Sequence, residues 1–212
     1  MNSALITVEI LLVVVTPLLF LYLKGSWPLR VIVPCLLTIP LLWYFTYAPL
    51  HELSHAAGTY FVGGKVTSIK IIPSFWLGEF GRAWINSEGV VEPWRQLITT
   101  LSPYLFDGLC IAAGLHLLRH SRLRNAFLIG FLFMLLFLRP AFDFVCETAG
   151  FLSGDKGDFY HLDMILGDLV TWAFMVTSLA VSFLSVFIVL RRFLGFPDTL
   201  SASADLAGRP PT

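Results

Sequence analysis

The hydrophobic pattern of the chain is a series of long apolar runs separated by short polar turns. The runs cover about residues 4–23, 31–62, 96–118, 126–151 and 162–190. A helix needs roughly 20 apolar residues to cross a bilayer, and each run reaches that length. In lipid the backbone has to satisfy its own hydrogen bonds, so the runs are expected to be helices. The pattern therefore predicts an all-α polytopic membrane protein with about five transmembrane helices.

Residues 65–92 follow a different pattern. Side chains alternate between two faces over residues 65–72, directly after Gly63-Gly64, and further glycines interrupt the segment. This alternation is typical of short strands. We expect a small surface β-strand or hairpin insertion after the second helix. Aromatic residues at the membrane interface would anchor it, namely Phe75, Trp76, Phe80 and Trp84.

Composition agrees with a membrane protein and excludes some other classes. The chain is 57% hydrophobic and 13% charged, against about one quarter charged in a soluble domain. Net charge is zero, and no basic block indicates nucleic acid as a partner. The three cysteines, Cys35, Cys110 and Cys146, have no paired spacing, so we interpret them as buried apolar residues.

The same features predict one membrane-embedded domain over residues 1–195, with its core at 31–190. A small, polar and proline-rich tail over residues 196–212 is expected to be disordered.

Basic residues predict the orientation in the bilayer. They cluster in the turn after the first run, in the turn after the third run and behind the fifth run. The residues are Lys24, Arg30, Arg119, Arg122, Arg124, Arg191 and Arg192. Positively charged turns favour the cytoplasmic side. We therefore predict an integral membrane protein with its N-terminus outside and its C-terminus in the cytoplasm.

The second apolar run contains an HExxH motif, formed by His51-Glu52-Leu53-Ser54-His55. Residues i and i+4 share one face of a helix, so both imidazoles can bind one metal ion. Glu52 lies between them and can take a proton from a metal-bound water. Burying two histidines and a glutamate in lipid without a function is costly. The motif therefore predicts a zinc site.

A catalytic zinc usually has three protein ligands and one open position. The helix order brings several acids back to the side of the membrane where the motif lies, and spacing alone leaves them all open as the third ligand. They are Asp107, Asp143, Glu147, Asp155 and Asp158. Asp168 is disfavoured because it should lie deeper.

Each of these acids also has an interpretation without a metal. Asp158 could cap the N-terminus of a helix. Asp107 could hydrogen-bond to neighbouring helices. Asp143 and Glu147 could form an internal ion pair with Arg139, one turn earlier, or line a water path to the metal.

The motif, its place in a transmembrane helix and the later sequence together resemble the site-2 protease family of intramembrane zinc metalloproteases. The segment Leu101-Ser102-Pro103-Tyr104-Leu105-Phe106-Asp107 stands where that family has a GPxxN motif, with Ser102 for the glycine and Asp107 for the asparagine. Gly157-Asp158-Phe159 stands where it has an LDG-type motif, with Phe159 for the glycine. The resemblance implies that His51, His55 and Asp158 bind Zn²⁺ and that Asp107 is a polar residue of the core.

The resemblance also implies a reaction. Glu52 would act as general base toward the zinc-bound water in peptide-bond hydrolysis and pass the proton to the leaving amine. The substrate would be a transmembrane or membrane-proximal protein segment, locally unwound and held by edge pairing to the strands after Gly64. One alternative is a non-proteolytic member of the same fold, acting as a metal- or partner-binding membrane scaffold. A transporter is a weaker alternative, since the sequence has no internal repeat.

Overall fold

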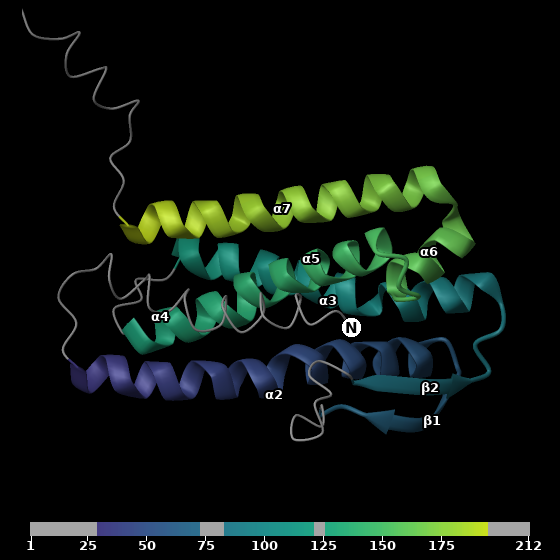
Figure 1. The fold of residues 1–212 in the computed structure, drawn as a ribbon, viewed down its shortest axis with the longest axis horizontal. Helices are drawn as coiled ribbons and strands as arrows, with labels where there is room; N and C mark the ends of the chain where they lie inside the picture. The colour runs from purple at the N-terminus through teal and green to yellow at the C-terminus, as the bar shows by residue number, and fades with distance from the viewer. Residues whose placement is uncertain (1–28, 73–82, 121–125, 195–212) are drawn as a thin grey trace, which may run out of the picture.

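The computed structural model describes residues 29–72, 83–120 and 126–194. The predicted first helix over residues 4–23, the anchors Phe75, Trp76 and Phe80, and the predicted tail over 196–212 lie outside the described residues. The described chain is mostly helical, with one small antiparallel sheet (Figure 1). Its elements are α2 (Leu29–Phe61), β1 (Lys65–Lys70), β2 (Trp84–Glu88), α3 (Pro93–His120), α4 (Ala126–Phe133), η2 (Met134–Leu138), α5 (Arg139–Leu152), α6 (Asp158–Leu166) and α7 (Asp168–Leu194).

The long helices lie side by side in one bundle, and the sheet and α6 lie at the same end of it (Figure 1). Among the described residues, three segments are long and apolar enough to cross a membrane: Pro93–His120, Leu128–Leu152 and Asp168–Arg192. The prediction of a mostly helical chain is confirmed, and three of its helical segments could cross a membrane. Insertion into a bilayer and its direction stay predictions.

The exposed surface of the bundle includes an apolar face on α7. Its outer face carries large apolar side chains that remain uncovered. Val176, Phe183, Leu184 and Phe187 are all exposed. In water such a face would be unfavourable, whereas in lipid tails it has no penalty.

Helix α2 ends at two glycines. Gly63 has a φ of 79°, which only glycine adopts readily. The Gly64 N–H donates to the Thr59 carbonyl at 2.8 Å and the Gly63 N–H to the Tyr60 carbonyl at 3.0 Å. These bonds form the Schellman pattern of a helix C-terminus. The chain then turns directly into β1.

The predicted hairpin is confirmed. Strands β1 and β2 are antiparallel, and Lys65 pairs with Glu88 and Lys70 with Trp84. An irregularity between Val66 and Ser68 interrupts the register, as expected for a bulge. The sheet has only these two strands among the described residues, so it depends on packing against the end of α2.

Helix α3 follows the hairpin and runs back along α2 (Figure 1). Its buried positions recur every three or four residues, and they include one acid. They are Pro103, Tyr104, Asp107, Cys110, Ile111 and Gly114. This spacing places one face of the helix against the core.

The fourth apolar run is one continuous helical rod with a π-helical turn in its middle. In that turn, the Arg139 N–H donates to the Met134 carbonyl five residues earlier. Pro140 follows and has no N–H to donate, which loosens the hydrogen-bond ladder at this point. The sequence predicted a single span here, and nothing in its hydrophobic pattern indicated the π turn.

The sequence predicted one helix over the fifth apolar run, residues 162–190, and this prediction was wrong: the run is divided between two helices. Short helix α6 begins at Asp158 and ends at Leu166. Gly167 then adopts a φ of 80° and breaks the helix before α7 begins. Phe159 and Leu162 of α6 are fully buried, and they pack with Tyr104 and Phe144 in the core. This packing fixes the start of α6 at the end of the bundle that carries the hairpin.

Candidate metal centre

The C-terminal half of α2 turns one face toward the bundle. Ala48, His55 and Thr59 are buried there, and His51 is half-buried on the same face. The spacing is helical, so a single face carries both histidines of the motif. His51 and His55 therefore point into the protein rather than toward the exposed side of α2.

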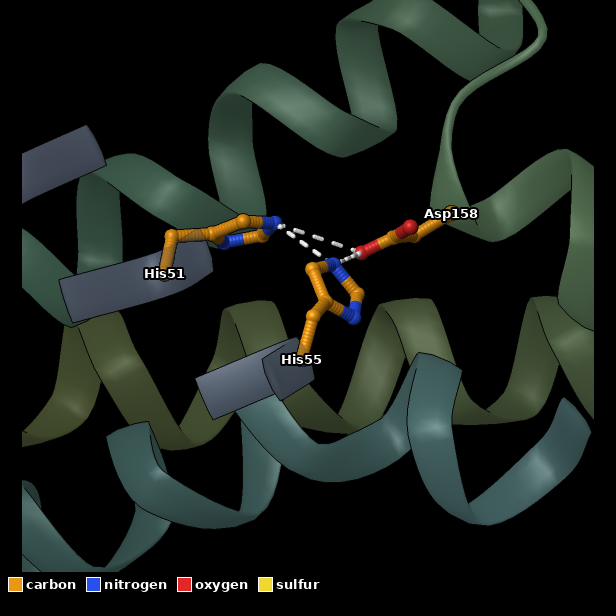
Figure 2. Close-up of side chains that lie close together, drawn as sticks. All are labelled: His51, His55 and Asp158. Atoms are coloured by element: carbon orange, nitrogen blue, oxygen red, sulfur yellow. Dashed lines mark hydrogen bonds and ion pairs between the residues drawn. The ribbon is translucent and has the colours of Figure 1, made fainter. Parts of the chain in front are cut away.

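The three residues predicted from the motif and the resemblance come together at one point. The Nε2 atoms of His51 and His55 are 3.2 Å apart. Asp158 Oδ2 lies 3.3 Å from His51 Nε2 and 3.0 Å from His55 Nε2. Figure 2 shows the two imidazoles on α2 facing the carboxylate at the start of α6. Among the described residues, these three side chains form a group that could hold a metal ion.

Hydrogen bonds on the far side of each ring decide which nitrogen faces this point. His51 Nδ1 lies 2.8 Å from Asp143 Oδ2, and His55 Nδ1 lies 2.9 Å from the Thr99 carbonyl oxygen. Both partners are acceptors, so each Nδ1 donates its hydrogen. In the neutral form each imidazole has only one N–H, so both Nε2 atoms then present lone pairs. Two such lone pairs and a carboxylate oxygen at about 3 Å repel one another, and either protons on the rings or a metal cation between the three atoms removes that repulsion.

The spacing of the three atoms fits zinc. Zinc binds imidazole nitrogen and carboxylate oxygen at about 2.0–2.2 Å, so two ligands of a tetrahedral ion lie roughly 3.3–3.6 Å apart. The observed separations of 3.2, 3.3 and 3.0 Å are close to this spacing and slightly shorter. Two histidines and one carboxylate also match a common ligand set of catalytic zinc, which leaves one position open. The residues present fit the group that the motif implies.

The start of α6 holds Asp158 in place. Gly157 precedes it in an extended conformation, and the Asp158 N–H donates to Glu147 Oε2 at 3.0 Å. The Tyr104 hydroxyl donates to Asp158 Oδ2 at 3.1 Å. A side chain at position 157 would meet Glu147 Oε2 at 2.7 Å. The glycine is therefore what lets Glu147 approach the backbone of the ligand.

Asp158 is ionised in this setting. Burial on its own would raise the pKa of its carboxyl, but with no metal bound the protonated imidazoles of His55 and His51 attract the carboxylate and hydrogen-bond to it, which holds the pKa below its ordinary value. Because α6 is a short helix outside the three apolar spans, this carboxylate lies at the end of the bundle. An ionised carboxylate is the form that binds a metal.

Glu52 lies next to the three converging residues. It is half-buried on α2, one position after His51. Its carboxylate interacts electrostatically with His51, His55 and Asp158. Glu52 is therefore near the converging atoms without belonging to them, as a proton-accepting group beside a metal should be.

The other acids considered from the sequence lie elsewhere. Asp107 is fully buried and forms an ion pair with Arg139. Asp143 and Glu147 contact His51 and the Asp158 backbone, respectively, as partners of the converging residues. Asp155 is exposed and accepts a bond from the Lys156 N–H.

Arg139 forms an internal ion pair, as predicted, but its partner is not the predicted acid. The sequence placed Arg139 with Asp143 or Glu147, because they follow it on one helix face. In the structure its guanidinium reaches across to Asp107 on α3. The sequence also did not single out Tyr104, whose hydroxyl bonds to Asp158. His161 is exposed and touches Tyr160, so it does not join the group.

Comparison with protein-family models, with curated proteins and with solved structures found no match to this chain. The functional argument therefore depends on the residues of this chain and their geometry.

Proposed function

We propose that the protein is an intramembrane zinc metalloprotease, which hydrolyses peptide bonds of membrane-embedded or membrane-proximal substrates. The observation that carries this proposal is the convergence of His51 Nε2, His55 Nε2 and Asp158 Oδ2 within 3.0–3.3 Å of one another, with Glu52 beside them. The resemblance to site-2 proteases points the same way. In this proposal those three residues hold Zn²⁺.

The residues of the site have separate roles in the proposed reaction. When bound, zinc makes a water acidic enough to attack at neutral pH and polarises the scissile carbonyl. Glu52 accepts a proton from the attacking water and then delivers it to the leaving amine. Asp143 and the Thr99 carbonyl hold the two imidazoles with Nε2 facing inward. Tyr104 and Glu147 hold Asp158.

The position of the hairpin suits an extended substrate. Strands β1 and β2 follow α2 directly, and they lie at the end of the bundle where the site lies (Figure 1). A segment of a transmembrane protein that unwinds at this end could add to the edge of the sheet through main-chain hydrogen bonds. Unwinding is needed because a helix keeps its peptide groups out of reach.

Membrane orientation is part of the same proposal. The helix ends that carry Arg119, His120, Arg191 and Arg192 lie at the end of the bundle opposite to the hairpin (Figure 1). The positive-inside rule places these ends in the cytoplasm. The protein is then an integral membrane protein with its site toward the outer side, its C-terminus in the cytoplasm and its N-terminus outside.

A metal-binding membrane scaffold of the same fold is the second candidate. One observation favours it. Asp107 stands where the resembling family has an asparagine, but it is buried against Arg139 rather than directed at the converging residues. A scaffold has no need of that asparagine, and it has no need of a general base at Glu52 either.

The experiment that separates the two uses Glu52→Gln in the full-length protein, reconstituted in vesicles with a membrane protein that the wild type cuts. The protease proposal expects cleavage to fall by at least roughly 100-fold, while zinc content stays at the wild-type level. Cleavage or a cellular phenotype that persists in Glu52→Gln would contradict the protease and leave the scaffold. The matched control is Glu92→Gln, an exposed glutamate between β2 and α3.

A further inference from the structure

Behind the converging residues, buried polar side chains continue from α2 toward the middle of the bundle. Asp143 is the first of them, with a side chain that is only 2% exposed. Its Oδ2 accepts the hydrogen of His51 Nδ1 at 2.8 Å. A buried carboxylate in a helix that could span a membrane is costly unless it has partners and a role.

Asp143 is itself held from behind. It interacts with Asp107 of α3 and with Arg139, one turn earlier on α5. Asp107 and Arg139 form an ion pair in which both side chains are essentially unexposed. The guanidinium also lies 5.2 Å over the Phe106 ring and donates to Cys110 Sγ at 3.7 Å. Arg139 and Asp107 thus fix α5 against α3 at the level where Asp143 projects toward His51.

The positive charge of Arg139 serves Asp143 as well as Asp107. The guanidinium interacts electrostatically with both carboxylates, and Asp143 in turn has its acceptor oxygen on His51. The buried charges therefore form one connected group, which runs from α3 through α5 to the ring of His51.

We infer that Asp143 is a positioning residue of the metal centre, which sets the tautomer and the orientation of His51 and is itself held in place by Asp107 and Arg139. The inference rests on the proposed function, because positioning a ligand matters only if a metal binds. Asp143 forces the hydrogen onto Nδ1 and turns the Nε2 lone pair toward His55 and Asp158. A carboxylate behind a histidine ligand also increases the basicity of the ring.

His51 depends on this contact more than His55 does. The backbone carbonyl of Thr99 holds His55, and no side-chain substitution removes that carbonyl. A side chain holds His51 instead, and it comes from a residue 92 positions away in the sequence. From the sequence, Asp143 was a candidate ligand, half of an ion pair or part of a water path, and a positioning role differs from all three.

The test measures zinc affinity of the full-length protein in detergent, by competition with a chromogenic chelator, for the wild type, Asp143→Asn and Asp143→Leu. We expect affinity to fall roughly 10-fold in Asp143→Asn, which keeps an acceptor oxygen, and roughly 100-fold in Asp143→Leu. Cobalt substituted for zinc should show shifted visible absorption bands in both variants. Asp155→Asn removes an exposed carboxylate from the loop before Asp158 and should leave affinity and spectrum unchanged.

The outcomes separate this inference from the proposed function. If the wild type binds zinc and Asp158→Ala does not, the metal centre stands; wild-type affinity and an unshifted cobalt spectrum in Asp143→Asn would then overturn the positioning role alone. If the wild type and Asp158→Ala bind zinc equally, or neither binds it, the metal centre itself is refuted. Should Asp143→Leu fail to fold, Asp143→Asn alone decides the outcome, because it preserves the shape of the side chain.

Discussion

Gly58 allows α2 and α3 to approach closely next to the candidate metal centre, so Gly58→Ala tests whether that approach matters. An alanine Cβ at this position would overlap Ser102 Oγ, and it would lie 2.9 Å from Ser102 Cβ and 3.1 Å from Thr99 Cα. Carbon atoms in ordinary contact lie about 3.5–4.0 Å apart, so α3 would have to move by roughly 0.6 Å or more.

The cost can be worked out from these contacts. Forcing an extra methyl group into a packed interface costs about 1–3 kcal/mol. The Ser102 hydroxyl would also lose its 2.7 Å hydrogen bond to the Ile98 carbonyl, which adds about 1 kcal/mol. Alanine is the better helix former and returns about 1 kcal/mol. We therefore expect Gly58→Ala to lower the free energy of unfolding by about 1–3 kcal/mol.

The same shift should reach the metal centre. Thr99 supplies the carbonyl that accepts the His55 Nδ1 hydrogen at 2.9 Å. Its Cα atom is one of the atoms that an alanine at position 58 would push away. Zinc affinity should therefore fall together with stability. Both are measurable on purified protein in detergent, by denaturant-induced unfolding without metal and by chelator competition with zinc.

A double-mutant cycle tests the contact between the two helices directly. Ser102→Gly removes both serine atoms that crowd position 58, so the Gly58→Ala and Ser102→Gly changes should couple favourably by about 1–2 kcal/mol. Gly108→Ala is the matched control, because a Cβ there meets nothing within 4 Å. A Gly58→Ala protein as stable as the wild type, or a cycle without coupling, would refute the close approach of the two helices.

Two further substitutions test the groups around the site. Gly157→Ala should displace Glu147 from the Asp158 N–H, since a Cβ would meet Glu147 Oε2 at 2.7 Å; we expect zinc affinity to fall roughly 10-fold in chelator competition, and wild-type affinity would contradict this. Arg139→Met should lower the free energy of unfolding by about 3–5 kcal/mol, because it leaves Asp107 buried without its cation. Adding Asp107→Leu should restore most of that loss in denaturant unfolding, and a double variant no more stable than the single one would count against the ion pair.

The sequence predicted the features that depend on local spacing. The i, i+4 separation of His51 and His55 is enough to place both on one helix face, and Gly63-Gly64 followed by alternating residues is enough to predict a helix end and a hairpin. Asp158 was one of five acids that helix order brought to the same side. The resemblance singled out Asp158 among them, and in the structure its position at the start of α6 brings it to His51 and His55, whereas Asp155 is exposed.

What the sequence could not predict depends on how helices are rotated about their axes. Asp143 and Arg139 lie on one helix at a spacing that suggests an ion pair, yet the Arg139 side chain crosses to Asp107 on α3. The π turn before Arg139 changes the face that the following residues present, and a hydrophobic pattern carries no signal for it. Gly167 breaks the fifth apolar run, and its positive φ could not be inferred because a single glycine is tolerated inside many helices.

The central claim is that His51, His55 and Asp158 hold one zinc ion, and the most direct test is the zinc content of the purified full-length protein. We expect one zinc per chain in the wild type and in Asp107→Asn, and none in Asp158→Ala. Elemental analysis after dialysis against a weak chelator measures all three. Zinc retained by Asp158→Ala, or lost only from Asp107→Asn, would contradict the claim.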